Sequence, residues 1–262
     1  MKLFRYVLVF VLLGLLAGCY EVNEEIAINA DGTGTFVTKM DMGQLLEMMQ
    51  SFAGEEKLSE EGMDKAIDTT FRMKDMLDSA KDITPEQKAL LSTGTMKVQM
   101  NIKEKIFKMD MHFPFSSQDN LQKLMAGQGN NGAGITDIFK QFFSDDKKQE
   151  DTTQIVDVAK DPDMQDISNI YDVTVKNGFI SKKINNVKYK ALMARPEMGQ
   201  IKQLSSSGME ILYTTTIKLP RPVKNSDNPL MKVSADKKTV TIHYNLLELL
   251  DNPEKFSYTL EY

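Results

Sequence analysis

The chain has 262 residues, 41% of them hydrophobic, which is enough apolar material for the core of one large domain or two modest ones. Its net charge of −5 makes nucleic acid and anionic membrane surfaces poor partners. The single cysteine excludes an intrachain disulfide and a zinc site built from several cysteines.

The first 18 residues have the three-part layout of a secretory signal peptide. Lys2 and Arg5 form a basic start, residues 6–16 are apolar, and small residues follow up to Cys19. The apolar run is shorter than the roughly 20 residues that a transmembrane helix needs. We therefore predict that residues 1–18 form a signal peptide.

Leu16-Ala17-Gly18-Cys19 resembles the lipobox of bacterial lipoproteins. An ordinary cleaved signal would also end in small residues, but a cysteine at this offset favours lipidation. The resemblance implies cleavage between Gly18 and Cys19, and acyl chains such as palmitate on Cys19 that anchor the protein in the membrane. Tyr20, rather than an aspartate, follows the cysteine, which in such lipoproteins indicates the outer membrane of the cell envelope.

Residues 20–30 alternate between apolar and polar side chains, which predicts a half-buried strand. One face would carry Tyr20, Val22, Ile26 and Ile28, and the other Glu21, Asn23, Glu25 and Asn29. The sequence Asp31-Gly32-Thr33-Gly34 indicates a turn, after which residues 35–40 form a second strand. The fold would thus begin directly after the lipidated residue.

Mixed signals follow over residues 41–125. Asp41 and Gln44 match a capping box, and the helix they predict would bury Leu45, Met48, Met49 and Phe52. Residues 67–74 alternate and predict a strand, with a helix as the alternative. Thr84-Pro85 marks a helix start.

The clearest β pattern lies at 96–113. Residues 96–102 and 107–113 alternate in opposite phase, which predicts a hairpin across 103–105. Two short helices are expected over 116–125 and 136–143. The polar stretches near 127–134 and 144–166 are expected to be flexible loops.

The C-terminal part again indicates paired strands. Asn177-Gly178 is a hairpin turn signal. The segments expected around it are strands at 171–176, 179–184, 209–219, 231–235, 239–244 and 256–262, with short helices at 196–204 and 246–250. The complete pattern predicts an α+β fold of about ten mostly antiparallel strands in hairpins, with several short inserted helices, in a single domain over 19–262.

No catalytic constellation stands out. Residues 127–132 fit G-x-G-x-x-G, but a polar helix rather than a buried strand precedes them, so a flexible loop is the better interpretation. Residues 144–147, 226–228 and 238–239 echo three motifs of penicillin-binding enzymes without their structural context. We predict no catalytic residue and a protein that is not an enzyme.

Metal sites are not indicated either. The methionines of 40–42 and 109–111 could offer thioethers to a soft metal such as Cu(I), but their alternation favours core packing. The acids of 161–166 lack the spacing of a calcium loop. His112 and His243 fall at exposed strand positions, so we predict no metal and no cofactor.

Two segments together support a resemblance to a known group. The lipobox is followed by the turn and strand motifs of 25–34 and 38–42, and Lys218-Leu219-Pro220 precedes two short strands and a closing strand. With these, the chain resembles bacterial envelope lipoproteins of the LppM-like kind. That implies an α+β domain behind a lipid anchor and an association with lipid binding, and it brings no catalytic residues; residues 43–210 have no part in it.

Three functions are compatible with these patterns. The first is a non-enzymatic envelope lipoprotein, anchored in the membrane through Cys19, that binds a lipid or other hydrophobic ligand. The alternative is a structural or assembly partner of other envelope proteins, without a small ligand. The third is a hydrolase whose site only the fold reveals. A sizeable apolar cavity would favour the first, and a flat exposed apolar patch the second. Clustered carboxylates or a buried histidine would favour the third.

Overall fold

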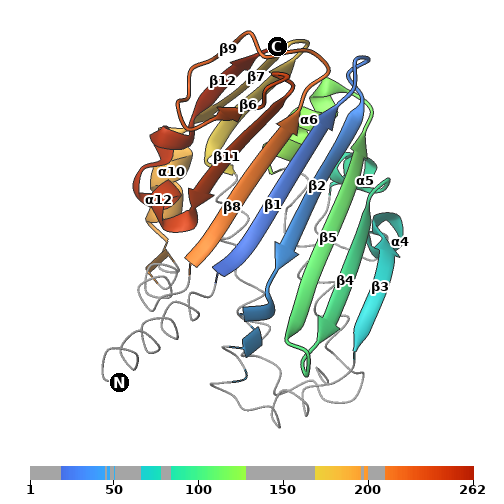
Figure 1. Cartoon of the computed structure of the whole chain (residues 1–262). Coiled ribbons are helices and arrows are strands. Elements are labelled where there is room, and N and C mark those ends of the chain that lie inside the picture. The colour runs from blue at the N-terminus through green and yellow to red at the C-terminus, as the bar shows by residue number, and fades with distance from the viewer. Residues whose placement is uncertain are drawn as a thin grey trace, which may run out of the picture.

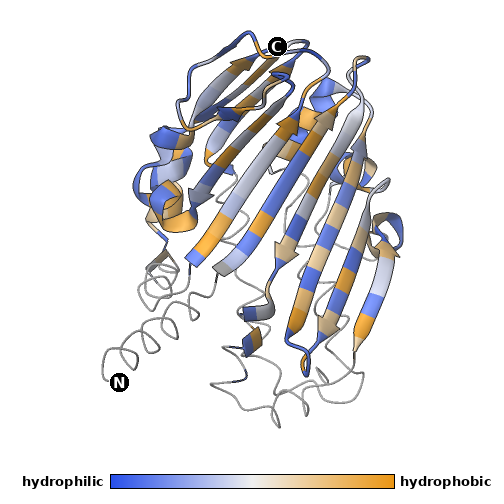
Figure 2. Cartoon of the chain, viewed as in Figure 1, coloured by the Kyte–Doolittle hydropathy of each residue, from blue (hydrophilic) through white to orange (hydrophobic). Residues whose placement is uncertain are grey.

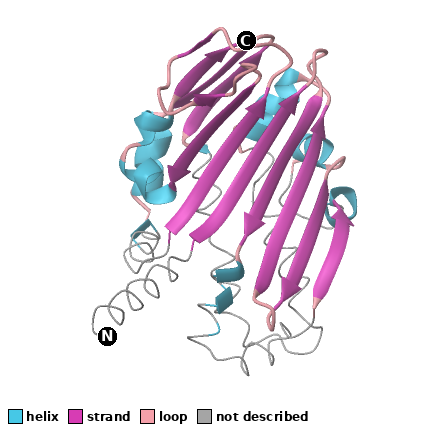
Figure 3. Ribbon diagram, in the orientation of Figure 1, coloured by secondary structure: helices cyan, strands magenta, loops and turns pink. Residues whose placement is uncertain are grey.

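The computed structural model describes residues 19–44, 46–47, 50, 66–77, 84–127, 169–195, 198–199 and 210–262. Within these ranges the chain forms an eight-stranded sheet, a four-stranded sheet and five α-helices (Figures 1 and 3). The strands are mostly antiparallel, which confirms the predicted α+β class.

The larger sheet has the strand order β10-β11-β8-β1-β2-β5-β4-β3. Its strands are β1 (Cys19–Ile28), β2 (Gly34–Asp41), β3 (Ile67–Arg72), β4 (Thr95–Asn101), β5 (Ile106–Phe115), β8 (Glu210–Lys218), β10 (Lys232–Val233) and β11 (Thr239–Asn245). All neighbours pair antiparallel except β1 and β8, which run parallel with Cys19 opposite Glu210. The central strand β1 therefore joins the N-terminal hairpins to the C-terminal part of the chain.

The smaller sheet has the order β6-β7-β12-β9 and lies beside the β11 end of the larger sheet (Figure 1). Its strands are β6 (Tyr171–Lys176), β7 (Phe179–Ile184), β12 (Tyr258–Glu261) and β9 (Asn225–Ser226). Gly178, in the turn between β6 and β7, has a φ of 79°, a conformation that suits glycine. The predicted Asn177-Gly178 hairpin is thus confirmed.

The helices are α4 (Met73–Leu77), α5 (Pro85–Leu91), α6 (Gln118–Met125), α10 (Asn186–Met193) and α12 (Leu246–Asp251), with a 3₁₀ turn at Pro253–Phe256. Side-chain caps begin four of them, because orphan backbone N–H groups of the first turn need acceptors. These caps are Thr84, Ser117, Asn185 and Asn245. Thr84 and Gln87 form a reciprocal capping box at the predicted start of α5.

Alternating hydropathy runs along the strands of the larger sheet (Figure 2). In the β4–β5 hairpin Met100 pairs with Phe107, and both side chains are buried. One cluster of buried apolar side chains includes members from both sheets, among them Met111 and Leu260. Such a shared core is what the predicted single domain over 19–262 would have.

Three segments differ from the sequence predictions. The strand predicted over 67–74 ends at Arg72, and Met73 begins α4 with its side chain 3% exposed. Helix α10 was not predicted, because only Leu192 among its residues is buried and an apolar face is therefore missing from the pattern. The two-residue strand β9 gives no periodic signal at all.

Several predictions lie outside the described residues. These are the signal peptide 1–18, the side chains of Leu45, Met48, Met49 and Phe52, residues 128–134, the helix 136–143, the loop 144–166 and nearly all of 196–204. The expected helix after Asp41 is seen in part, with helical residues within 43–50 and a backbone hydrogen bond from Leu46 N to Met42 O at 3.1 Å. Asp41 Oδ1 accepts a hydrogen bond from Gly43 N at 3.1 Å. Over the described ranges, the search for long apolar helices found none able to cross a membrane.

Candidate functional site

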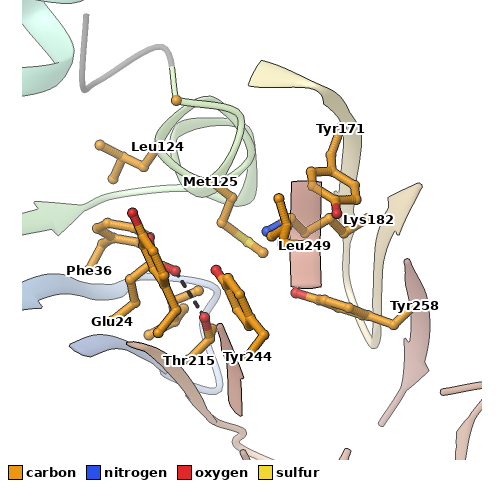
Figure 4. A pocket seen from close by; sticks show the side chains of 13 residues that line it. Glu24, Phe36, Leu124, Met125, Tyr171, Lys182, Thr215, Tyr244, Leu249 and Tyr258 are labelled. Atoms are coloured by element: carbon orange, nitrogen blue, oxygen red, sulfur yellow. Dashed lines mark hydrogen bonds between the residues drawn. The ribbon is translucent and has the colours of Figure 1, made fainter. Parts of the chain in front are cut away.

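A hollow lies between the inner faces of the two sheets, beside α6 and α12 (Figure 4). It is lined by Glu24, Ile26, Phe36, Leu124, Met125, Gly127, Tyr171, Lys182, Tyr213, Thr215, Tyr244, Leu249 and Tyr258. Its volume is about 620 Å³ when the part open to solvent is included. The space open to the centre of a water molecule is only about 30 Å³, so the hollow as it stands has room for one or two waters.

Glu24 reaches the hollow because of strand alternation. It lies on the inward face of β1, between the buried Val22 and Ile26. The parallel register places it opposite Thr215 of β8, whose hydroxyl donates to Glu24 Oε2 at 3.0 Å. Strict period two over residues 20–28 already puts a carboxylate on the apolar face, and this is the signal that could have identified Glu24.

Four tyrosines bring rings and hydroxyls to the hollow from both sheets. Tyr213 and Tyr244 are paired across β8 and β11 and stack with centroids 5.0 Å apart. Burial raises the pKa of Tyr171, Tyr213, Tyr244 and Tyr258, so all four are neutral at neutral pH. Neutral phenols are hydrogen-bond donors, but Tyr171 already donates to Pro253 O at 2.9 Å.

Lys182 of β7 enters the hollow from the smaller sheet. Its Nζ lies 4.6 Å from the centre of the Tyr171 ring. No described carboxylate comes within 4.0 Å of this Nζ. Burial lowers the pKa of Lys182, while the charge of Glu24 acts in the opposite direction. Its neighbour Lys183 points to the other face and forms an ion pair with Asp227 at 2.7 Å.

A second, more open hollow lies on the opposite face of the larger sheet. The space open to the centre of a water molecule is about 300 Å³ there, against about 30 Å³ in the inter-sheet hollow. The outward side chains that line it are Glu21, Asn23, Leu212, Thr214, His243 and Asn245. His243 Nδ1 lies 2.9 Å from Thr214 Oγ1, and His243 is exposed as predicted. His112 is also exposed, on β5. Neither histidine is placed as a buried catalytic group.

The candidate motifs are not assembled into sites. Met109 and Met111 are buried in the core while His112 is exposed, so the three do not converge. No group of three or more His, Cys, Asp or Glu side chains gathers as a metal site in the ranges described. The Asn228 side chain is used structurally, donating to the carbonyls of Lys255 and Ser257, both at 2.9 Å.

Other positions in the candidate motifs are only partly described. Gly127 lines the inter-sheet hollow, but residues 128–132 and 144–147 lie outside the described ranges, as do the acids of 161–166. Cys19 opens β1, and its side chain is not described. Val187 and Val233 are the large apolar residues exposed on the described surface, at 79% and 42%. They lie on separate elements, α10 and β10, and form no flat patch.

A scan against protein-family models, a search of curated proteins and a search of solved structures each found no match to the chain. The fold and the site define a mostly antiparallel α+β protein with a hollow between two sheets that is lined by both apolar and polar side chains. The resemblance to LppM-like lipoproteins stays a prediction.

Proposed function

We propose that the chain is a lipid-anchored, non-enzymatic protein of the bacterial cell envelope that binds a hydrophobic ligand in the hollow between its sheets. The observation that carries the proposal is the mixed lining of this hollow. Its apolar side chains are Ile26, Phe36, Leu124, Met125 and Leu249. Tyrosine hydroxyls, Glu24, Thr215 and Lys182 lie among them, and such a mixture of apolar walls with a few polar groups is typical of ligand sites.

The size of the hollow requires it to open for a ligand. Ligand sites commonly measure about 300–1,000 Å³, well above the space of about 30 Å³ that the hollow now offers. Met125 stands at the end of α6, and a methionine side chain is unbranched and adaptable. A ligand would gain space by displacing Met125 and the water between the sheets.

The predicted anchor supports a ligand taken from the bilayer. Acyl chains on Cys19 would fix the start of β1 at the membrane, and Glu24 follows five residues later on the same strand. Five residues of extended chain span about 16 Å. The hollow would therefore lie close above the lipid head groups, in what we propose to be the outer membrane.

Native mass spectrometry tests the proposal. We would export the mature chain with Cys19→Ser, which keeps the full length of β1 but cannot be acylated, and purify it from a bacterial envelope. We expect added mass that disappears on solvent extraction and matches a lipid. Met125→Trp should fill the hollow and remove this mass, whereas Val187→Trp, a change of similar bulk at an exposed site, should retain it.

Two results would overturn the proposal. One is a clean apo mass together with no uptake of added lipids, which would favour the assembly-partner alternative. The other is equal lipid retention by Met125→Trp and the unsubstituted chain, because the ligand would then lie elsewhere. In parallel, the intact membrane-extracted protein should begin at Cys19 and carry the mass of its acyl chains.

A further inference from the structure

We propose that the ligand carries an acidic head group, a carboxylate or a phosphate, that binds beside Lys182. This inference rests on the proposed ligand-binding function and assigns one end of the ligand to one wall of the hollow. The chemistry shared by the two head groups is a compact anion with several hydrogen-bond acceptors.

The first argument is the contrast between Lys182 and Lys183. They are consecutive residues of β7, so their side chains leave opposite faces of the smaller sheet. Lys183 Nζ lies 2.7 Å from Asp227, and both side chains are about half exposed. Lys182 instead enters the hollow, where no described acidic group is within ion-pairing distance. The sheet thus places a more deeply buried cation, with no ion-pair partner among the described residues, next to a surface cation that has one.

The second argument concerns the energy of this arrangement. Removing an ammonium group from water is unfavourable unless an anion or hydrogen-bond acceptors replace the water. The face of the Tyr171 ring, 4.6 Å from Lys182 Nζ, offsets part of this cost of desolvation, because a cation is attracted to an aromatic face by roughly 0.5–2 kcal/mol. An anionic group seated in the hollow would supply the missing counter-charge.

The third argument is the set of groups around Lys182. Tyr244 and Tyr258 point their hydroxyls toward the same space in Figure 4. Burial raises the pKa of both phenols, so they are protonated at neutral pH and able to donate to an anion. Among the described residues the Tyr258 hydroxyl has no hydrogen-bond partner. Lys182 and these phenols together form a cluster of donors.

Glu24 is the group that opposes an anion. Its carboxylate comes from the larger sheet, bound to Thr215, and its negative charge partly counters the effect of burial on Lys182. An acidic head group would therefore bind toward the smaller sheet and away from Glu24. This sets two opposite expectations, in which loss of the lysine charge weakens binding and loss of the glutamate charge strengthens it.

The test compares three probes with the same alkyl chain, namely dodecanoate, dodecyl phosphate and 1-dodecanol, using the mature Cys19→Ser chain and calorimetry. We expect one or both acids to bind at least about tenfold more tightly than the alcohol. Lys182→Met should remove this preference, Lys182→Arg should keep most of it, and Glu24→Gln should increase it. Lys183→Met is the matched control and should leave it unchanged. The two acids then distinguish a carboxylate from a phosphate ligand.

The outcomes separate this inference from the function on which it rests. Equal binding of the alcohol and both acids would overturn the acidic head group while leaving a hydrophobic ligand in place. An acid preference that survives Lys182→Met would also overturn it. Binding of none of the three probes, with folded protein by circular dichroism, would overturn both proposals.

Discussion

Thr38 stands at a position in β2 where the core has a polar atom without a partner. The residue is 3% exposed and lies opposite Met111 in the pairing with β5. Its hydroxyl makes no hydrogen bond in the described part of the molecule. A buried hydroxyl without a partner is destabilising by about 1–3 kcal/mol. Thr215, 6% exposed on the same face of the sheet, differs because its hydroxyl donates to Glu24.

We therefore expect opposite effects from the same substitution at these two threonines. Thr38→Val replaces the unpaired hydroxyl by a methyl group of similar shape and should raise the free energy of unfolding by about 1 kcal/mol. Thr215→Val removes a donor from a carboxylate and should lower it by about 1.5–3 kcal/mol. Urea unfolding measures both. Destabilisation by Thr38→Val would show that its hydroxyl has a partner.

Single residues also show why the site was missed in the sequence. Lys182 stands in Ser181-Lys182-Lys183, a polar run that is typical of a solvated strand. Strand alternation sends the two side chains to opposite faces, and the packing of the smaller sheet against the larger one then makes Lys182 the less exposed cation. Glu24 and Thr215 are 191 residues apart, so their hydrogen bond depends on a strand pairing that no local pattern encodes.

Among elements, the β1–β2 hairpin uses two glycines for different reasons. Gly32 has a φ of 85°, the left-handed conformation that the turn signal predicted. Gly34 is the first residue of β2, where a Cβ would lie 1.9 Å from the Ala27 carbonyl oxygen and 2.4 Å from Phe115 Cζ. Close approach of a backbone carbonyl, rather than backbone conformation, requires glycine there.

Gly34→Ala should accordingly lower the free energy of unfolding by about 3 kcal/mol or more, because a backbone carbonyl cannot move aside as a side chain can. Gly199→Ala is the control, since a Cβ there meets nothing within 4 Å and the residue is helical. We expect that control to stabilise the protein by up to about 1 kcal/mol. Thermal unfolding of both variants decides the matter, and similar midpoints would contradict the close contact at Gly34.

Hairpins were the predictable elements, and crossovers were not. The β4–β5 and β6–β7 pairs follow from alternation and turn residues that lie within one short stretch of sequence. The parallel pairing of β1 with β8 depends on two strands whose connection includes most of the chain. Local periodicity indicates which face of each strand is buried, but it carries no information about which distant strand lies alongside.

At the scale of the whole molecule, buried phenols couple stability to alkaline pH. Burial raises the pKa of the four tyrosines of the hollow, and that of Tyr20 to about 12. In the unfolded chain these groups titrate near 10.0. Above that pH the unfolded chain releases protons that the folded chain retains, so the tyrosines' contribution to stability is complete below pH 10 and is lost as pH rises.

We predict that the free energy of unfolding falls steeply between about pH 10 and 12, with each unit of pKa difference worth about 1.36 kcal/mol per group. Lys182 has the opposite effect at lower pH. Burial depresses its pKa below the value of 10.5 expected in the unfolded chain, so between these two pKa values the folded chain has already lost a proton that the unfolded chain retains. In that range Lys182 makes the free energy of unfolding rise with pH. Urea unfolding at a series of pH values, with tyrosinate absorbance in parallel, measures the effect. Tyr20→Phe should make the free energy of unfolding fall less steeply above pH 10. A free energy of unfolding that does not change above pH 10 in the unsubstituted chain would contradict the prediction.

The start of β1 at Cys19 has a consequence for movement at the membrane. A domain on a long tether samples many heights and orientations above a bilayer, whereas here the residue proposed to carry the acyl chains is itself paired with Glu210 in the middle of the sheet. The strands would then stand upright, with the β4–β5 turn low and the Asn29–Thr33 turn about 30 Å higher. The hollow would stay at a nearly constant distance from the bilayer surface. A ligand would exchange with the bilayer across that distance, without waiting for the domain to diffuse toward the membrane.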